Sequence, residues 1–372
     1  KLLLMKIAFV APRFHTNQIT LIKYLIKKGN QISFYVTRKG KTEDHSILKP
    51  RIIQKNIFTN LVKLLVRPKN YLFDYRYGIP SFKELISLKS KKFDLIIVRD
   101  PINLMGLFYF VWAKIIGINV LLYAQQQIFK KKSSIKEKFK EYFIRFTKDK
   151  WISPCLGNKK FKKISNNIYY LPFCYSSHSY KKKWFINNQF NILTIGKFIE
   201  RKNHLLLIES LSKLNSIFRK KISLIIIGEC STQDHYYYLQ KVKKAAKKSG
   251  LKIKILTNIN PKKIKKYYKI SDCFVLPSTD EPASVSNIEA MAYGLPVITT
   301  DSNQTSCYTK NGINGYIVKS NNIIDLSNKL RFLIKNKSKT KNFGKESLRL
   351  IKYRYNPEII YEKFFTKFFC IN

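Results

Sequence analysis

The chain has 372 residues, of which 45% are hydrophobic and 14% aromatic. This composition suffices for two domains with separate cores and excludes a largely disordered protein. Lysine and arginine number 71 against 22 acidic residues, giving a formal net charge of +49 that is spread along the sequence. Such a surface attracts anionic lipid or nucleic acid, and of these two partners we favour an anionic membrane surface.

The cysteines and the apolar segments indicate the compartment. Six cysteines form no Cys-x-x-Cys pair and show no metal-ligand spacing with the five histidines, which predicts a reducing cytoplasm. Residues 1–14 are apolar but short, so we expect a buried first strand and no signal peptide. The most apolar window, 104–124, contains Lys114, and a helix, a turn at Gly117 and a strand explain it better than a membrane-spanning helix.

Short apolar strands alternate with helical patterns along the chain, which is typical of βα units with a parallel sheet. After the first strand, Thr16 or Asn17 can cap a helix that ends at Gly29. Arg13 and His15 lie in the same loop, so with Asn17 they can face a crevice at the start of that helix. Strands are expected in the first half at 6–12, 31–36, 93–100 and 119–125.

Residues 128–151 predict an amphipathic helix with lysines around an apolar stripe. Ile135, Phe139, Phe143 and Phe146 fall on one helical face. The helix could lie at a membrane interface, or it could bury the stripe against the sheet. We favour burial, because packing of the helix needs an apolar stripe.

The second half repeats the pattern and gives a second doubly wound domain. A polar, basic stretch at 175–189 marks the boundary. We therefore predict an α/β protein with Rossmann-like domains at 1–185 and 186–352 and a C-terminal amphipathic helix within 353–372, with a ligand between the domains. Strands are expected at 190–196, 222–229, 253–256, 273–277, 296–300 and 315–318.

The segment DEPASVSNIEAMAYGLPVI, residues 280–298, contains two glutamates with seven residues between them. One continuous helix would separate them by roughly 12 Å, too far for a joint action. Pro282 disfavours helix after Glu281, whereas Ser286 and Glu289 have the spacing of a capping box for a short helix that stops at Gly294. Glu289 could thus be only a cap.

A loop between the two glutamates could instead turn both carboxylates towards one ligand. Backbone N–H groups from Ser284 to Asn287, at the helix start, favour an anion, and the donor-binding candidates here are Ala283, Ser284, Val285 and Ser286. Carboxylates accept hydrogen bonds from hydroxyl groups. A ligand with hydroxyls on both sides of a phosphate fits this arrangement, and a nucleotide sugar is such a ligand.

A second element, GKFIERK at residues 196–202, follows the first strand of the second domain. Gly196 permits a tight turn, and Lys197 and Lys202 flank the loop before a helix rich in leucine. In a chain with so many lysines, the pair could equally be a solvated surface. Its position after a strand favours a phosphate-binding role, and the absence of an Asp-x-Asp cluster argues against a metal, so we expect no cofactor.

The two elements together resemble the family-four retaining glycosyltransferases, which have the GT-B fold. The glutamate pair followed by AMAYGLPVI resembles the donor-site signature, and GKFIERK resembles the element G-R-x-x-x-x-K, with Lys197 where arginine is usual. The resemblance implies transfer of a sugar, with retention of configuration, from a nucleoside diphosphate to a glycan or lipid-linked acceptor. Lys197 and Lys202 would then hold the diphosphate, Glu281 the sugar and Glu289 the ribose.

Other positions match the family less well. Gly228 resembles the strand end v-G-x-G, in which the second glycine is replaced here, and Ile259 occupies the place where the backbone holds the base. The first domain lacks the Gly-Gly loop found in many relatives. Acceptor-side candidates are Arg13, His15, Asn17 and Gln125.

We thus expect a cytoplasmic enzyme of cell-surface polysaccharide or lipopolysaccharide synthesis, peripheral on the inner membrane face. Alternatives are a basic nucleic-acid-binding protein, for which no reading motif is found, and another GT-B enzyme. The latter could be a sugar-nucleotide epimerase or a phosphorylase, and a phosphorylase would need a lysine-bound cofactor.

Overall fold

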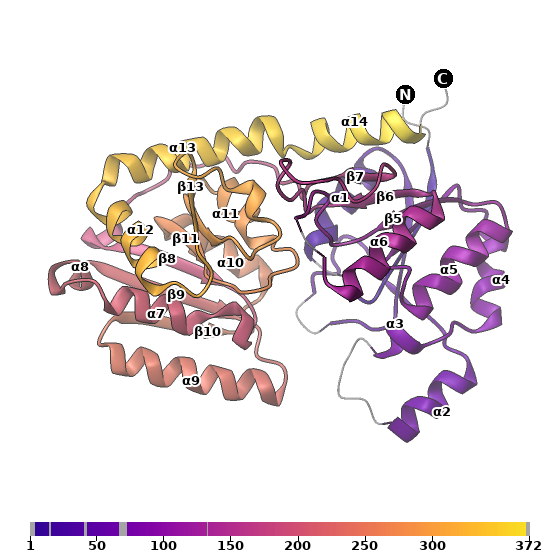
Figure 1. Cartoon of the computed structure of the whole chain (residues 1–372), viewed down its shortest axis with the longest axis horizontal. Coiled ribbons are helices and arrows are strands. Elements are labelled where there is room, and N and C mark those ends of the chain that lie inside the picture. The colour runs from indigo at the N-terminus through magenta and orange to yellow at the C-terminus, as the bar shows by residue number, and fades with distance from the viewer. Residues whose placement is uncertain (1–3, 15, 41–42, 67–72, 132, 370–372) are drawn as a thin grey trace. The chain divides into compact units, whose positions relative to one another are not determined.

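The computed structural model describes residues 4–369 except 15, 41–42, 67–72 and 132 (Figure 1). The predicted acceptor-side residue His15 lies outside the described residues. The chain forms two compact units, one of residues 1–172 and 357–372 and the other of residues 173–356.

The first unit is built on a seven-stranded sheet in the order β3-β2-β1-β4-β5-β6-β7, in which every strand pair is parallel. This strand order is that of a doubly wound, Rossmann-like sheet. Buried apolar residues fill the strands, because helices must cover both faces of a parallel sheet. The strands are β1 (Lys6–Ala11), β2 (Gln31–Val36), β3 (Arg51–Ile52), β4 (Leu95–Arg99), β5 (Asn119–Tyr123), β6 (Lys150–Ser153) and β7 (Ile168–Tyr170).

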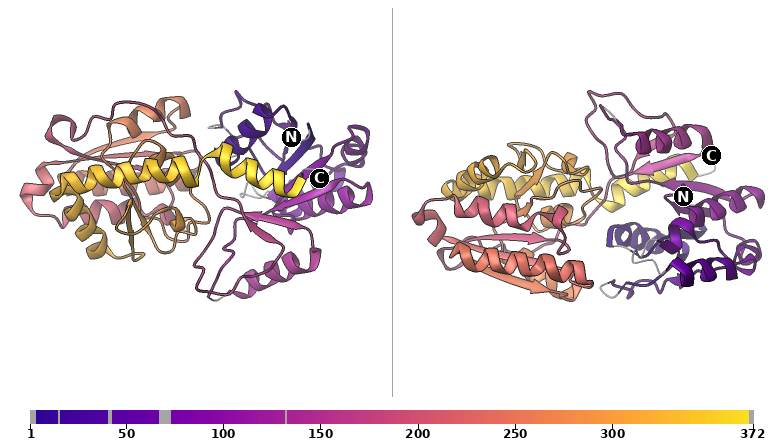
Figure 2. Two further views of the ribbon diagram at one scale, coloured as in Figure 1. Left: turned by 90° about the horizontal axis from the view of Figure 1, so that it is seen from above. Right: turned by 60° about the horizontal axis from the view of Figure 1, so that its bottom comes forward.

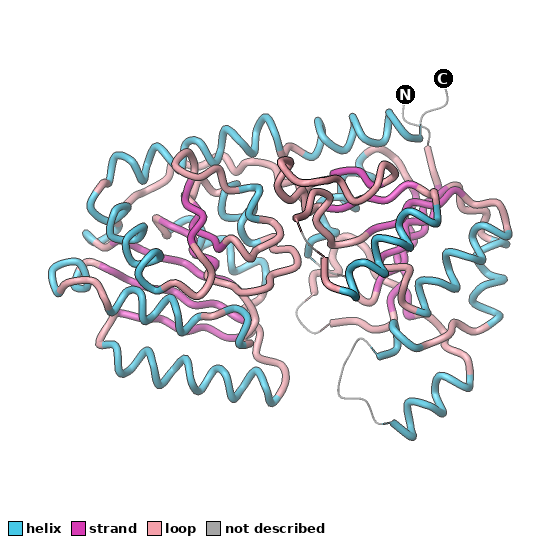
Figure 3. Tube along the Cα trace, in the orientation of Figure 1, coloured by secondary structure: helices cyan, strands magenta, loops and turns pink. Residues whose placement is uncertain are grey.

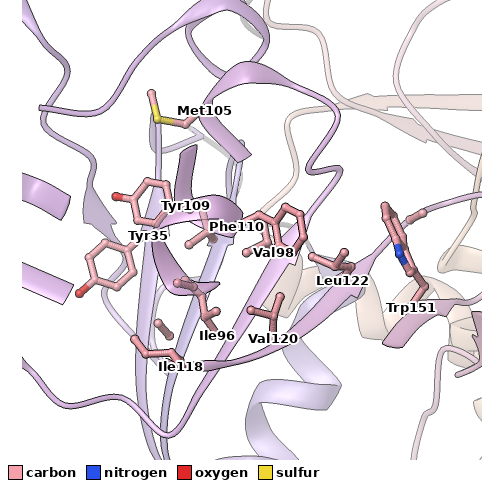
Figure 4. Packing of buried hydrophobic residues seen from close by; sticks show 14 of the residues in the cluster. Tyr35, Ile96, Val98, Met105, Tyr109, Phe110, Ile118, Val120, Leu122 and Trp151 are labelled. Atoms are coloured by element: carbon pink, nitrogen blue, oxygen red, sulfur yellow. The ribbon is translucent and has the colours of Figure 1, made fainter. Parts of the chain in front are cut away.

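A large part of the core of this unit lies between the sheet and the helices that follow β3 and β4. Figure 4 shows Tyr35, Val98 and Tyr109 in this cluster, with Trp151 of β6 at one side. The helices are α1 (Thr16–Lys27), α2 (Ile57–Val66), α3 (Phe73–Tyr77), α4 (Phe82–Ser90), α5 (Leu104–Ile115), α6 (Ile135–Thr147) and α14 (Pro357–Phe369).

The C-terminal helix α14 belongs to the first unit and packs on α1. Tyr24 of α1 donates to Glu362 over 2.8 Å, and its ring contacts Tyr361 and Phe365. Figure 2 shows this yellow segment beside the indigo part of the chain. The amphipathic pattern around Phe364 therefore reflects burial, since Phe364 and Phe365 are both buried.

The second unit has a six-stranded parallel sheet in the order β10-β9-β8-β11-β12-β13, again that of a doubly wound fold. In Figure 3 its magenta strands run between cyan helices. The strands are β8 (Phe190–Ile195), β9 (Ile222–Gly228), β10 (Lys252–Thr257), β11 (Cys273–Leu276), β12 (Val297–Thr300) and β13 (Gly315–Val318).

Helices α7, α9 and α12 pack together in the second unit, and α11 packs against α13. The core combines leucines of α7 and α12 with the strand residues. The helices are α7 (His204–Ser212), α8 (Ser216–Lys220), α9 (Gln233–Ser249), α10 (Pro261–Ile270), α11 (Ser286–Ala292), α12 (Ile323–Lys335) and α13 (Lys337–Arg354).

Every strand predicted from the sequence is present, and β3, β6 and β7 are additional. The apolar window at 104–124 forms α5, a turn at Gly117 with φ +75° and β5, as predicted. None of the helices in the described part of the chain has the length and apolarity needed to cross a bilayer.

The first unit ends after Pro172, earlier than the predicted boundary after residue 185. Residues 173–185 are bound to the second unit by hydrogen bonds. Tyr180 donates to the carbonyl of Tyr293 over 2.7 Å, and the N–H of Phe185 donates to Asp272 over 2.8 Å. The polar composition of this segment is typical of a linker, but its hydrogen bonds make it part of the second unit.

The favoured orientation of the helix at 128–151 is wrong. Ile135, Phe139 and Phe146 of α6 are 88%, 64% and 71% exposed. The helix instead turns Ile144 and the partly buried Phe143 to the sheet, where Phe143 contacts Trp151 edge to face. An exposed apolar stripe remains on the outer side of α6.

Candidate functional site

Glu281 lies in the loop after β11, at the carboxyl end of the second sheet, where ligands of doubly wound folds bind. Its side chain is only 4% exposed. The Oε2 atom accepts hydrogen bonds from Lys202 Nζ and from Arg201 Nη1, each over 2.6 Å. Two cations thus converge on one oxygen of a buried carboxylate.

Lys202 reaches this carboxylate because Gly196 leaves room for it. A Cβ at position 196 would lie 2.9 Å from Lys202 Cδ. Burial lowers the pKa of Lys202, whereas the neighbouring Glu281 acts to raise it. The backbone is fixed as well, since the N–H of Thr279 donates to the Arg201 carbonyl over 2.8 Å. The structure therefore brings together Gly196, Lys202 and Glu281, three of the predicted site residues.

Lys197 has a different acidic partner. Its Nζ lies 3.2 Å from Glu229 Oε2, at the end of β9. No ion pair between Lys197 and Glu281 is found among the described residues. Gly228 precedes Glu229 and allows a close backbone approach, because a Cβ there would lie 2.3 Å from the Gly196 carbonyl oxygen. The two predicted diphosphate lysines therefore have separate carboxylate partners.

Glu289 is held by two tyrosine hydroxyls. Tyr175 donates to Oε1 over 2.6 Å and Tyr268 to Oε2 over 2.8 Å. Burial, with the adjacent carboxylate, raises the pKa of both phenols well above the usual value. The Tyr268 ring also stacks on Tyr293, with ring centroids 5.0 Å apart. Glu289 is thus fixed in one orientation by protonated hydroxyl donors.

The predicted capping box at the start of α11 is wrong. The cap position is Val285, with no side-chain cap hydrogen bond, and Glu289 extends to the tyrosines. The Ser286 hydroxyl instead lies 2.8 Å from Ser284 Oγ. The helix does end as predicted, with Gly294 at φ +66°. Ser286 and Glu289 thus have the spacing of a capping box, but the Glu289 carboxylate accepts its hydrogen bonds from Tyr175 and Tyr268.

The loop between the glutamates is held by neighbouring backbone and hydroxyl groups. The N–H of Ser284 donates to Thr305 Oγ1 over 3.1 Å, so this group already has a partner. Ala283, Val285 and Ser286 are half-buried. Ile259 is also half-buried, in the loop after β10.

The acceptor-side candidates that the structure describes, Arg13, Asn17 and Gln125, lie in the first unit. Arg13 Nε donates to Glu43 Oε1 over 2.6 Å. Gln125 accepts from Arg99 Nη2 over 3.1 Å. Asn17 is half-buried in the first turn of α1. Arg13 and Gln125 thus have different protein partners.

Three residues that the sequence reasoning missed complete the site. Arg201 adjoins Lys202 in the chain, and its proximity to the predicted lysine was the available signal. Tyr175 and Tyr268 carried no such signal, because they lie 114 and 21 residues before Glu289. Only the fold brings these hydroxyls to the carboxylate.

This geometry can be compared with known proteins. The family model "Glycosyl transferases group 1" matches residues 176–349, nearly the whole second unit. The second unit is therefore similar to the group 1 glycosyl transferases. Both glutamates, Gly196 and Lys202 lie within the matched residues.

Solved structures of this kind match almost the whole chain. A glycosyltransferase from Rickettsia africae is 18% identical, with a TM-score of 0.71, over 98% of this chain and 97% of that one. Anabaena Alr3699/HepE, solved with UDP and glucose, is 14% identical, with a TM-score of 0.70, over 98% and 99%. These likenesses show that the fold is GT-B, as predicted.

Curated relatives match over shorter segments. An Escherichia coli UDP-Gal:alpha-D-GlcNAc-diphosphoundecaprenol alpha-1,3-galactosyltransferase is 28% identical over 38% of this chain and 36% of its own length. The Staphylococcus aureus capsular polysaccharide biosynthesis glycosyltransferase CapM is 23% identical over 54% and 51%. The matches thus span about half or less of these relatives.

Proposed function

We propose that the protein is a glycosyltransferase that moves a sugar from a nucleoside diphosphate to a glycan or lipid-linked acceptor with retention of configuration. The observation that carries this proposal is the convergence of Lys202 and Arg201 on Glu281 at the carboxyl end of the sheet. Two cations and one carboxylate leave a net positive charge there. Such a site suits an anionic group that gains charge during the reaction.

Departure of the nucleoside diphosphate places negative charge on its terminal phosphate. Lys202 and Arg201 would stabilise that charge as it develops, because both are already positioned before the reaction. Glu281 would hold these cations in place and accept hydrogen bonds from the transferred sugar. The departing phosphate would help to take the proton of the acceptor hydroxyl, so that the new glycosidic bond forms on the face that the phosphate leaves.

Glu289 would bind the ribose diol of the donor. Each carboxylate oxygen can accept two hydrogen bonds and already accepts one from a tyrosine. One acceptor position on each oxygen is therefore left for the two ribose hydroxyls. The tyrosines fix the carboxylate before the donor binds, which lowers the cost of ordering it.

The names of similar proteins support the classes of donor and acceptor. The E. coli relative is named for UDP-galactose and a diphosphoundecaprenol acceptor, and the Anabaena structure holds UDP and glucose. A uridine nucleotide is therefore the first donor to test. We place the protein in the cytoplasm at the inner membrane face, in cell-surface polysaccharide or lipopolysaccharide synthesis, and without a metal, since cations of the chain take the diphosphate role.

Replacement of Glu289 by alanine tests the assignment. Binding of UDP and GDP is measured by thermal shift for the wild type and for Glu289→Ala, together with turnover of the donor. A ligand at a hundred times its Kd stabilises the native state by about 2.7 kcal/mol, which is easily detected. We expect the variant to lose most of that shift. Unchanged donor binding and turnover would remove the proposed donor site.

A further inference from the structure

The outer side of α6 exposes an apolar stripe that the fold of the first unit does not use. Ile135, Phe139, Tyr142 and Phe146 are 88%, 64%, 67% and 71% exposed. Their spacing of four, three and four residues places them along one line of the helix. The rings of Tyr142 and Phe146 stack, with centroids 6.3 Å apart. A stripe of this length on a surface helix is costly in water unless something covers it.

A basic pocket adjoins this stripe. Its volume is about 430 Å³, and its lining includes six cationic side chains and one carboxylate. Lys138 and Arg145 of α6 both line it, and each directly precedes a phenylalanine of the stripe. At roughly 100° per residue, both cations fall on the same flank of the stripe. The remaining cations are Lys130, Lys131, Lys162 and Lys163.

The acidic groups near the pocket neutralise only some of these cations. Glu137 caps α6 at Ser134 and pairs with Lys130. Glu141 is buried and accepts from Ser133 Oγ over 2.5 Å and from Gln126 Nε2 over 3.3 Å. Within the described ranges, no ion pair engages Lys131, Lys138 or Lys162. Their charge is thus available to an external anion.

We propose that the apolar stripe of α6 and the adjoining basic pocket form a docking surface for an anionic phospholipid bilayer. The four apolar side chains enter the region between headgroups and acyl chains, while the lysines of the pocket bind lipid phosphates. Charge complementarity selects this occupant, because a protein partner would need an equally dense acidic surface beside an apolar groove. The proposal does not rest on sugar transfer, since binding to lipid requires no donor.

Helix α2 provides an internal comparison. It also exposes apolar side chains, among them Phe58 at 65% and Leu65 at 84%. The lysines near it, Lys55 and Lys63, are paired with Asp74 over 3.0 and 2.9 Å. In the described part of the chain, α2 thus exposes apolar area beside lysines that are held in ion pairs, unlike Lys138 and Lys162 of the α6 surface, so its variants are a matched control.

The test is sedimentation of the full chain with vesicles. Equimolar phosphatidylglycerol and phosphatidylcholine is compared with phosphatidylcholine alone, without any nucleotide. We expect the wild type to bind only the anionic vesicles. The double variant Phe139→Ser with Phe146→Ser should weaken vesicle binding by about tenfold or more. The double variant Lys138→Gln with Lys162→Gln should weaken it by roughly thirtyfold, since each charge contributes a little more than about fivefold. Phe58→Ser with Leu65→Ser should change binding by less than about twofold.

Three outcomes would overturn the proposal. The first is an equal loss of binding in the α2 and α6 variants, and the second is full binding after removal of the α6 phenylalanines. The third is full displacement by inorganic phosphate at matched ionic strength, which would indicate a free anion site. As a second measurement, Phe146→Trp should shift its fluorescence to shorter wavelength on anionic vesicles. That signal does not depend on a variant that weakens binding.

Discussion

Arg201 Nη1 lies 2.6 Å from Glu281 Oε2, whereas Lys197, where the family resemblance places an arginine, pairs with Glu229. A guanidinium, four residues after position 197 in the chain, thus lies at Glu281. Arg201 is 39% exposed, so its other nitrogens are accessible to a ligand. We infer that Arg201 carries more of the diphosphate contact than Lys197.

Arg201→Ala is expected to weaken UDP binding more than Lys197→Ala does. Loss of one hydrogen bond to a charged phosphate costs about 1.5–3 kcal/mol, roughly tenfold to a hundredfold in Kd. Arg201→Lys should restore part of it, because the charge returns without the planar fork. Titration calorimetry with UDP measures all three variants. A larger loss of UDP affinity in Lys197→Ala than in Arg201→Ala would show that Lys197 makes the stronger diphosphate contact. Failure of the wild type to bind UDP would count against a uridine nucleotide as the donor.

Glu281→Ala is expected to destabilise the second unit. Lys202 is 10% exposed, and removal of its carboxylate leaves a buried charge without compensation, a change that costs about 3–5 kcal/mol. The double variant Glu281→Ala with Lys202→Met should recover much of that loss, because the charge is removed too. Urea unfolding of both variants measures the difference. Equal stability of the single and double variants would show that Lys202 finds another partner or water.

Tyr268→Phe is expected to raise KM for the donor by roughly fivefold and to leave kcat little changed. The substitution removes one hydroxyl that orients Glu289, a loss of about 1 kcal/mol, without touching the reacting groups. Tyr267→Phe is the matched control, since Tyr267 is also buried in α10 and has no role at Glu289. An equal change of KM in the control would indicate a general effect on α10.

The stability of the second unit should depend on His204 in mild acid. Burial lowers the pKa of this imidazole to about 3, and its ring lies between Phe198 and Tyr238. In the unfolded chain the His204 imidazole is protonated as the pH falls below about 6.5, whereas in the native state it stays neutral down to about pH 3. The contribution of His204 to stability is therefore complete above pH 6.5 and is lost as the pH falls.

The expected slope from this group is about 1.4 kcal/mol per pH unit in that window. His204→Phe keeps an aromatic ring in the same place and removes the titration. The unfolding free energy of the variant, measured in urea from about pH 7 to about pH 4.5, should fall less steeply than that of the wild type. Parallel curves would mean that the native imidazole accepts its proton without penalty.

The sequence predicted the strands well because each is a short apolar run that must be covered on both faces. It also placed Gly196, Lys202 and Glu281 at one site, since carboxyl ends of parallel strands meet at one edge. The sequence did not predict which face of α6 is buried. Phe143 and Phe146 follow the same helical period, and tertiary contacts with Phe110 and Trp151 cover Phe143 alone.

The partners of Glu289 show the same limit in the site itself. The spacing from Ser286 to Glu289 is a local pattern, and it predicted a local contact. The carboxylate instead accepts hydrogen bonds from the hydroxyls of Tyr175 and Tyr268, which come from other parts of the chain. Arg201 was overlooked for a related reason, because Glu281 lies 80 residues away and only the folded loop brings both neighbouring cations to it.

Tyr175 lies in the segment 173–185, which looks like a tether between units but supplies a hydroxyl to Glu289 and a backbone hydrogen bond to Tyr355. Exchange of the second unit between enzymes, or its expression alone, therefore has to start at Phe173 and extend to Asn356. A shorter excision at residue 186 would remove Tyr175 and leave Glu289 without one of its two hydroxyl donors.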